Sequence, residues 1–396
     1  MFSENNGITE NKRHSLSFNG SGTGYFSIWL VNILLTAITL GVFLPWALVR
    51  SRRYFYTRTE LAGQRFAYHA TGKSILGGWL CIAVLYVIFL INIAHGNIKL
   101  SLAMLLLFIL FFPWLMMQGL RYQAMMTSLN NVRFNFQTNP LRAWWVLLGQ
   151  PLAMTVALSV VGVIILKATQ ATYSPVAVLW GAVFTVLILL TGIAVMQGVY
   201  ISQRIKLVFN HFQYGNARFA IDASIKRCTL IALTGMVLFL PFIFLAGYLM
   251  ASPIMTMAMV GSDEAAMALA MGQFAGRMAL VYFIYLAGVL ACYGYTVVTL
   301  RNYLYGQLSL NGTLRFHSTA RVGRFLWLAF SGLFVCGITA FLAWPWARVR
   351  MTRYLLENTH LEGDLATLPP EDHNEQPAKD PANLLARGLS VAQFVF

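Results

Sequence analysis

Hydrophobic residues along the chain are gathered into eight long runs separated by shorter polar segments. The runs lie at about residues 26–49, 75–94, 100–119, 143–166, 176–200, 228–250, 278–300 and 325–347. A helix needs roughly 20 consecutive apolar residues to cross the hydrocarbon layer with its backbone hydrogen-bonded internally. The pattern therefore predicts an all-α polytopic membrane protein, with six spans in the centre and two further hydrophobic segments at the ends.

Composition strengthens this prediction. Of the 396 residues, 58% are hydrophobic and 10% are charged, whereas a soluble globular chain carries about 25% charged residues. The net charge is +15, but the basic residues are scattered between the runs and do not form one charged domain. A nucleic-acid partner is therefore not expected, and membrane lipids are the expected partners.

The basic residues favour one side of the predicted spans. The connections 50–74, 120–142, 201–227 and 301–324 hold 18 Lys or Arg, while the three alternate connections hold one each. Because cytoplasmic loops carry an excess of Lys and Arg, the first four connections are expected in the cytoplasm.

An internal repeat connects these basic segments. Residues 45–54 read PWALVRSRRY and residues 345–354 read PWARVRMTRY, and a third copy begins at Pro113 and Trp114. Two degenerate copies begin at Lys206 and Arg301. Because every copy falls on the predicted cytoplasmic side, the repeats are expected to be parallel and related by an axis along the membrane normal.

Short β-hairpins are predicted after the repeated motif. The stretches RFAYHA, RFNFQT, RFAIDA and LRFHST alternate apolar and polar residues, and Asn311-Gly312 is typical of a type I′ turn. Unpaired strand edges are unfavourable, so these cytoplasmic strands are expected to pair with or cover one another.

The first and last runs leave two alternatives open. A single crossing at 325–347 would carry Arg348, Arg350 and Arg353 outside, although their repeat equivalents are expected inside. The alternative is a re-entrant segment that breaks near residues 36–41 and 337–339 and returns, which membranes tolerate only when protein shields it. The predicted organisation is a polar N-terminal segment (1–25), a repeat-built transmembrane domain (26–356) and a flexible, proline-containing C-terminal tail (357–396).

The opening SFNGSGTGYFSIWLVNILLTAITLG, followed by PWALVRSRRYFYTRTELAG and RFAYHATG, resembles the YjgN-type family of uncharacterised bacterial inner-membrane proteins. The resemblance covers nearly the whole chain. It implies a multi-pass protein of a bacterial inner membrane and supplies no activity, substrate or catalytic residue.

The repeated Pro-Trp-x6-Arg-Tyr motif provides the candidate site residues. Trp, Tyr and Arg are suited to anchoring at the membrane interface, and a late proline can kink a span. Under a second interpretation the Arg side chains, whose planar forks match phosphate oxygens, bind an anionic ligand. The interface or kink residues are Pro45, Trp46, Pro113, Trp114, Pro345 and Trp346; the candidate ligand-binding residues are Arg50, Arg53, Tyr54, Arg121, Tyr122, Arg350, Arg353 and Tyr354.

Enzyme chemistry has little support in the sequence. All 13 acidic residues fall in tails or connections without an evident acid–base pair, and the histidines lack partners at metal-binding spacing. No catalytic residue, metal or cofactor is expected. The sequence favours a non-enzymatic protein that binds or transports a small anionic or lipid-like ligand; the alternative is a structural or lipid-organising protein without transport.

Overall fold

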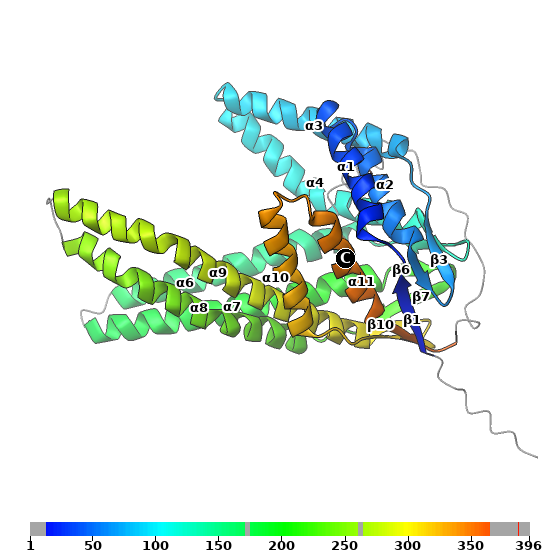
Figure 1. The fold of residues 1–396 in the computed structure, drawn as a ribbon. Helices are drawn as coiled ribbons and strands as arrows, with labels where there is room; N and C mark the ends of the chain where they lie inside the picture. Colours follow the sequence, from blue (N-terminus) through cyan, green and yellow to red (C-terminus); the bar gives the residue numbers. More distant parts are fainter. Residues whose placement is uncertain (1–12, 171–174, 260–263, 365–386, 388–396) are drawn as a thin grey trace, which may run out of the picture.

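The computed structural model describes residues 13–170, 175–259, 264–364 and Arg387, and this part of the chain is mostly helical (Figure 1). The predicted N-terminal segment up to residue 12 and most of the predicted tail, 365–386 and 388–396, lie outside the described residues.

The described elements follow one order five times: a strand, two helices that run out and back, and a second strand. Unit 1 contains β1 (Arg13–Phe18), α1 (Gly22–Ile38), α2 (Leu44–Thr57) and β2 (Thr59–Leu61). Unit 2 contains β3 (Gln64–Tyr68), α3 (Gly72–Ala94), α4 (Ile98–Met125) and β4 (Thr127–Leu129). Unit 3 contains β5 (Val132–Phe136), α5 (Pro140–Trp144), the π-helical turn η1 (Trp145–Gly149), α6 (Gln150–Gln170), α7 (Pro175–Phe209) and β6 (Phe212–Tyr214). Unit 4 contains β7 (Ala217–Ile221), α8 (Ile225–Met259), α9 (Glu264–Gln307) and β8 (Leu308–Leu310), and unit 5 contains β9 (Leu314–Ser318), α10 (Val322–Ile338), α11 (Trp344–Glu357) and β10 (Thr359–Glu362).

Six helical stretches among the described residues are long and apolar enough to cross a membrane, which agrees with the predicted polytopic α-helical class. They are Gly72–Ala94, Ile98–Met125, Pro140–Ile165, Phe184–Phe209, Ile225–Met257 and Met267–Gln307. Only 6% to 22% of each apolar stretch is buried inside the protein. So much exposed apolar surface requires an apolar solvent, as a lipid bilayer provides.

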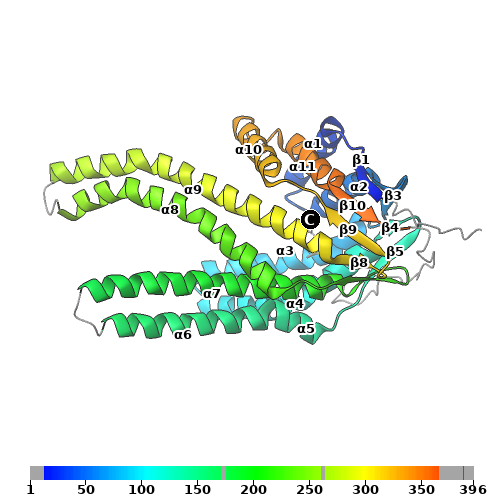
Figure 2. The same cartoon turned by 90° about the horizontal axis from the view of Figure 1, so that it is seen from below.

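The first and last hydrophobic runs form two short helical hairpins, α1–α2 and α10–α11. A turn at residues 39–43 separates α1 from α2, and a turn at 339–343 separates α10 from α11. Figures 1 and 2 show that the short hairpins lie near the strands, whereas α6 to α9 extend much further away. Each terminal run is therefore broken in the structure.

The strands pair with one another in a ring. All pairs are antiparallel in the order β1-β10-β9-β8-β7-β6-β5-β4-β3-β2, and β2 pairs again with β1. The loop between β8 and β9 contains Asn311 and Gly312 with φ of 54° and 73°, as the predicted turn requires. It holds three residues between the paired Leu310 and Leu314, one more than a type I′ hairpin needs.

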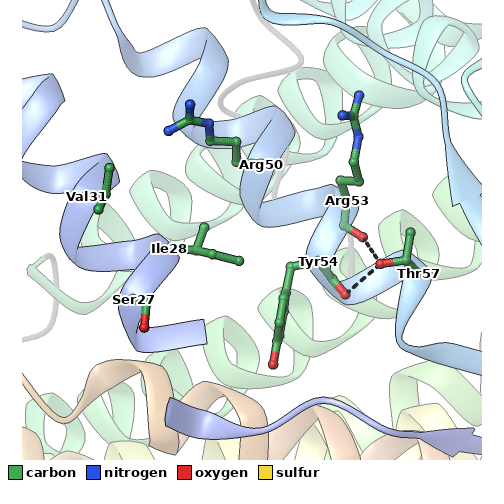
Figure 3. Close-up of a pocket in the computed structure, with 7 residues that line it drawn as sticks. All are labelled: Ser27, Ile28, Val31, Arg50, Arg53, Tyr54 and Thr57. Carbon is green, nitrogen blue, oxygen red and sulfur yellow. Dashed lines mark hydrogen bonds between the residues drawn. The ribbon is translucent and has the colours of Figure 1, made fainter. Parts of the chain in front are cut away.

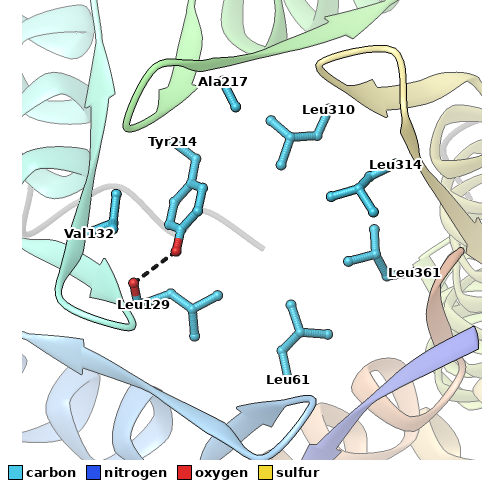
Figure 4. Packing of buried hydrophobic residues seen from close by; sticks show 8 residues of the cluster. All are labelled: Leu61, Leu129, Val132, Tyr214, Ala217, Leu310, Leu314 and Leu361. Atoms are coloured by element: carbon cyan, nitrogen blue, oxygen red, sulfur yellow. Dashed lines mark hydrogen bonds between the residues drawn. The ribbon is translucent and has the colours of Figure 1, made fainter. Parts of the chain in front are cut away.

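The inside of the ring is a packed apolar core, and Figure 4 shows the side chains pointing toward its centre. The buried cluster consists of Leu61, Leu129, Val132, Tyr214, Ala217, Leu310, Leu314 and Leu361, and Leu16, Phe66, Phe134, Phe219 and Phe316 pack against it. Successive strand residues point to opposite faces, so Arg65, next to Phe66, is 67% exposed on the outside. Small barrels are commonly filled by side chains in this way.

The ring extends beyond the boundaries drawn from the sequence. Residues Arg13–Phe18 belong to the predicted N-terminal segment and Thr359–Glu362 to the predicted tail, yet both are strands of the ring. These strands carry no hydrophobic run, because only one of their faces is buried.

Candidate functional site

The tyrosine of the Arg-Tyr motif fastens the end of one helix to the start of another within each unit where it occurs. The Tyr54 hydroxyl accepts a hydrogen bond from Ser21 N–H at 2.9 Å and donates to Ser21 O at 2.7 Å. Ser21 is the N-cap of α1. The equivalent contacts are Tyr122 with Ser74 Oγ (2.6 Å), Tyr303 with Ser224 N–H (2.8 Å) and Tyr354 with Arg321 N–H (2.6 Å). Tyr54, Tyr303 and Tyr354 thereby satisfy backbone N–H groups at helix N-termini, which lack partners within the helix, whereas Tyr122 contacts a serine hydroxyl in the first turn of α3.

The residue before the tyrosine reaches the next unit. Arg53 Nη2 donates to Ala70 O at 3.0 Å, and Arg353 Nη2 donates to Gly20 O at 2.7 Å. Asn302 Nδ2 donates to Ala320 O at 2.8 Å. Each acceptor carbonyl belongs to the residue directly before the N-cap of the next unit's first helix. The Arg353 contact joins unit 5 back to unit 1.

Two tryptophans of the motif, Trp46 and Trp346, also pack against the next unit. A Cβ added to Gly72 would lie 2.4 Å from Trp46 Cδ1, and one added to Gly22 would lie 2.2 Å from Trp346 Cδ1. Both glycines open the first helix of their unit. Only a residue without a side chain lets the indole rings approach so closely.

Two of the three prolines of the motif occupy places different from those expected. Pro45 and Pro345 lie in the first turn of α2 and α11, where a missing backbone N–H costs little, so they begin helices rather than kink spans. Pro113 lies inside α4, followed by the half-buried Trp114, and is the one of the three where a kink is expected.

The candidate ligand-binding residues do not form one cluster, and most of them contact other parts of the protein. Tyr54, Tyr122 and Tyr354 make the helix contacts given above, and Arg121 also has an interaction partner. Arg53 and Arg353 bind backbone carbonyls, while Arg50 and Arg350 are exposed. Their role as ligand residues remains a prediction.

One open groove brings three of these residues together. It has a volume of about 480 Å³, lies between α1 and α2, and is lined by Ser27, Ile28, Val31, Arg50, Arg53, Tyr54 and Thr57 (Figure 3). Ile28 and Val31 supply an apolar wall from α1. Arg50 and Arg53 supply two positive charges from α2, so the groove is amphipathic.

Arg50 is the side chain of the groove that is most available to a ligand. Its guanidinium lies 5.2 Å from the centre of the Phe43 ring, and no hydrogen bond or ion pair ties it to another described residue. The other arginines of α2 differ, because Arg52 donates to the Tyr68 hydroxyl at 3.3 Å and Arg53 binds Ala70. Burial raises the pKa of Tyr68, so this phenol stays protonated beside Arg52.

The two short hairpins differ at the groove although their motifs are alike. A shift of 300 residues places Trp327 at the position of Ser27 and Glu357 at that of Thr57. It also places Gly332 at the position of Asn32, which is buried between α1 and α2 and donates to Ala47 O at 3.0 Å. Unit 1 therefore has small or hydroxyl-bearing residues where unit 5 has an indole and a carboxylate.

Four lining residues are not among those predicted from the sequence: Ser27, Ile28, Val31 and Thr57. The α1 residues follow the i, i+4 spacing of one helix face, yet nothing local distinguishes this face from the rest of an apolar run. Comparison of the two hairpins could have identified Ser27 and Thr57. Across 13–170, 175–259 and 264–364, no group of three His, Cys, Asp or Glu side chains is placed to hold a metal ion.

Comparisons with known proteins agree with the helical membrane architecture. The chain is similar to Inner membrane protein YjgN of Salmonella typhimurium, with 37% identity over 96% of both chains. It is also similar to the proteins of that name from Escherichia coli O157:H7 and strain K12, with 32% and 31% identity over 95% of each chain. No solved structure matches the chain. Residues 13–379 match the model of a bacterial protein family of unknown function, DUF898, so the chain belongs to this family of YjgN-like inner-membrane proteins.

Proposed function

We propose that this chain is a multi-pass protein of a bacterial inner membrane that binds an anionic, lipid-like ligand in the groove between α1 and α2. The observation that carries the proposal is the amphipathic lining: Arg50, which has no hydrogen bond or ion pair to another described residue, lies opposite Ile28 and Val31. Arg matches phosphate oxygens through its planar fork, and an apolar wall favours an acyl chain.

The proposed orientation puts the groove at the cytoplasmic boundary of the membrane. Arg50 and Arg53 lie in one of the four basic connections that together hold 18 of the 21 Lys and Arg between the spans, and such segments favour the cytoplasm. The cytoplasmic leaflet is the usual source of anionic headgroups. A ligand taken from that leaflet would reach the groove laterally.

The proposed topology treats the two short hairpins as re-entrant segments of parallel repeats. Tyr54 bonds to Ser21, and Tyr354 to Arg321, so each hairpin returns to the level at which it started. With a rise of 1.5 Å per residue, the 17 residues of α1 reach about 25 Å, less than the roughly 30 Å of the hydrocarbon layer.

A second candidate function is lipid organisation without a specific ligand. The packed Leu and Phe side chains inside the ring favour it over transport along the ring axis. In this case the Arg-Tyr motif would only fasten the units together, and the exposed helices would order lipid around them.

Native mass spectrometry of the gently solubilised chain tests the two candidates. We expect a bound anionic lipid whose occupancy falls in Arg50→Gln but not in Arg218→Gln, which removes one charge from the exposed face of β7. Equal occupancy in both variants, or no bound lipid in the unaltered chain, would contradict the proposed site and favour the second candidate.

Labelling of single cysteines in a cysteine-free background tests the orientation. An impermeant maleimide should reach Asn97→Cys from outside and Thr313→Cys from inside, and should reach Leu40→Cys at the hairpin tip from neither side. Labelling of Leu40→Cys from outside would contradict re-entry.

A further inference from the structure

We propose that phospholipid crosses between the two leaflets along the sector of the membrane occupied by the two short hairpins, with the α1–α2 groove guiding the headgroup. This inference rests on the proposed function, because it takes the groove ligand to be a membrane phospholipid.

The α1–α2 hairpin reaches only part of the way along its neighbour. Trp79 Nε1 donates a hydrogen bond to Gly41 O at the hairpin tip, at 3.1 Å. Trp79 is the eighth residue of α3, which continues to Ala94. At 1.5 Å per residue, residues 80–94 extend about 22 Å beyond the level of the tip.

The tips of both short hairpins have the chemistry of segments that end inside hydrocarbon. Leu40 is 95% exposed and Phe341 is 62% exposed, so apolar side chains cover the outside. Backbone N–H groups at both tips are paired within the turn, since Gly41 N–H donates to Thr36 O and Phe341 N–H donates to Cys336 O, both at 2.7 Å.

A threonine completes each turn in the same way. Thr39 Oγ1 donates to Leu35 O and accepts from Phe43 N–H, and Thr339 Oγ1 does the same with Val335 O and Ala343 N–H. Backbone groups in hydrocarbon must be paired, because no water is present there. The backbone N–H groups of residues 39–44 and 339–344 meet that condition without a headgroup or solvent partner.

The two short hairpins lie side by side, so their shallow regions form one sector. Arg353 of unit 5 binds Gly20 of unit 1, and Arg348 Nη1 donates to the Tyr25 hydroxyl at 3.1 Å. The long helices α3 and α9 border this sector, against α2 and α10 respectively. Lipid must fill the depth that the hairpins leave open, and a hydrophobic mismatch of this kind is relieved by thinning of the bilayer.

Thinning shortens the distance that a headgroup travels through hydrocarbon, and the groove supplies polar contacts at its cytoplasmic end. Arg50 offers a charge for the phosphate, and Ser27 and Thr57 offer hydroxyl oxygens. Transfer of an unpaired charge into hydrocarbon is very costly, so even a short polar path changes the rate of crossing strongly.

Reconstitution of the full chain into vesicles of phosphatidylethanolamine and phosphatidylglycerol, with trace fluorescent phosphatidylglycerol, tests the inference. Dithionite bleaches only label in the outer leaflet, so crossing appears as bleaching beyond that pool. We expect crossing with the unaltered chain and a rate about tenfold lower in Arg50→Gln, as for the loss of one charge-assisted hydrogen bond. Arg218→Gln is the control for charge.

A steric pair of variants tests the route. Ser27→Trp puts the indole of unit 5 into the unit 1 groove and should slow crossing to a similar extent, whereas Leu34→Trp places the same side chain on an exposed part of α1 outside the groove. Equal rates in Ser27→Trp and Leu34→Trp would overturn the inference. Both variants must elute as the unaltered protein does, which excludes misfolding.

Lipid occupancy of the same samples separates the two proposals. Bound phosphatidylglycerol in the unaltered chain together with bleaching confined to the outer leaflet would overturn the inference and leave the proposed binding function intact. Absence of both bound lipid and crossing would overturn both.

Discussion

The Tyr354 hydroxyl holds both backbone groups of Arg321: it accepts a hydrogen bond from the N–H at 2.6 Å and donates one to the carbonyl oxygen at 3.0 Å. Arg321 is the N-cap of α10 and forms no capping hydrogen bond with its own side chain. Ser21, the N-cap of α1, is held by Tyr54 in the same way. The Arg-Tyr motif has the composition of an interface anchor or ligand site. Its tyrosine also joins the second helix of each short hairpin to the N-cap of the first.

Removing one hydroxyl should expose this structural role. Tyr354→Phe removes the hydrogen bonds to the N–H and carbonyl of the exposed Arg321, and a typical intramolecular hydrogen bond contributes about 0.5–1.5 kcal/mol net. We expect a lower free energy of unfolding by that amount, measured by denaturant titration in detergent. Tyr248→Phe, at a tyrosine that is 78% exposed, is the matched control and should change little. Equal stability of the two variants would argue against the cap.

Two glycines of α3 should respond in opposite directions to the same substitution. In Gly72→Ala the new methyl group meets the ring of Trp46, and overpacking of this kind costs about 1–3 kcal/mol. In Gly77→Ala nothing lies within 4 Å of the new methyl group, so the helix gains about 0.5–1 kcal/mol. Thermal unfolding of both variants checks the sign; a Gly72→Ala protein as stable as the unaltered one would show that Trp46 does not lock unit 1 to unit 2.

The apolar core of the ring should be sensitive to cavities. Leu314 is fully buried, and Leu→Ala changes at such sites cost about 2–5 kcal/mol. Leu314→Ala is therefore expected to lower the unfolding midpoint strongly. Leu141→Ala, at a leucine that is 79% exposed at the start of α5, should leave it nearly unchanged. Tolerance of Leu314→Ala would mean that the inside of the ring is loosely packed.

Acidification should weaken one pair on the outside of the ring. The hydrogen bond from Arg65 holds the pKa of Glu60 below its ordinary value. A carboxyl group whose pKa is lowered by folding stabilises the folded state above its unfolded pKa, and this contribution is lost as the pH falls through the folded pKa. We expect the unfolding temperature to fall slightly more between about pH 5 and pH 3 in the unaltered chain than in Glu60→Gln, because exposed pairs contribute little. If the unfolding temperatures of the two proteins fall in parallel with pH, the Glu60–Arg65 pair is not a source of the pH dependence.

The sequence by itself determined the class of protein. Runs of about 20 apolar residues are read directly as helices, because a chain in lipid has few other ways to pair its backbone groups. The shift of 300 residues between PWALVRSRRY and PWARVRMTRY likewise required no structure to find. Even the break in the terminal runs was among the alternatives, since a plain crossing would have carried Arg350 and Arg353 to the side opposite their repeat equivalents.

Only the tertiary structure decided which partner each polar group of the motif has. That Tyr54 caps its own unit, that Arg53 reaches Ala70, and that Arg50 is left at an open groove all depend on contacts between segments 17 to 33 residues apart in sequence or further. The two strands at the ends of the chain, β1 and β10, likewise could not be found from the local sequence pattern, because four to six residues with one buried face carry too weak a signal. Contacts between distant segments determined where these residues lie, and the hydrophobic pattern along the chain did not.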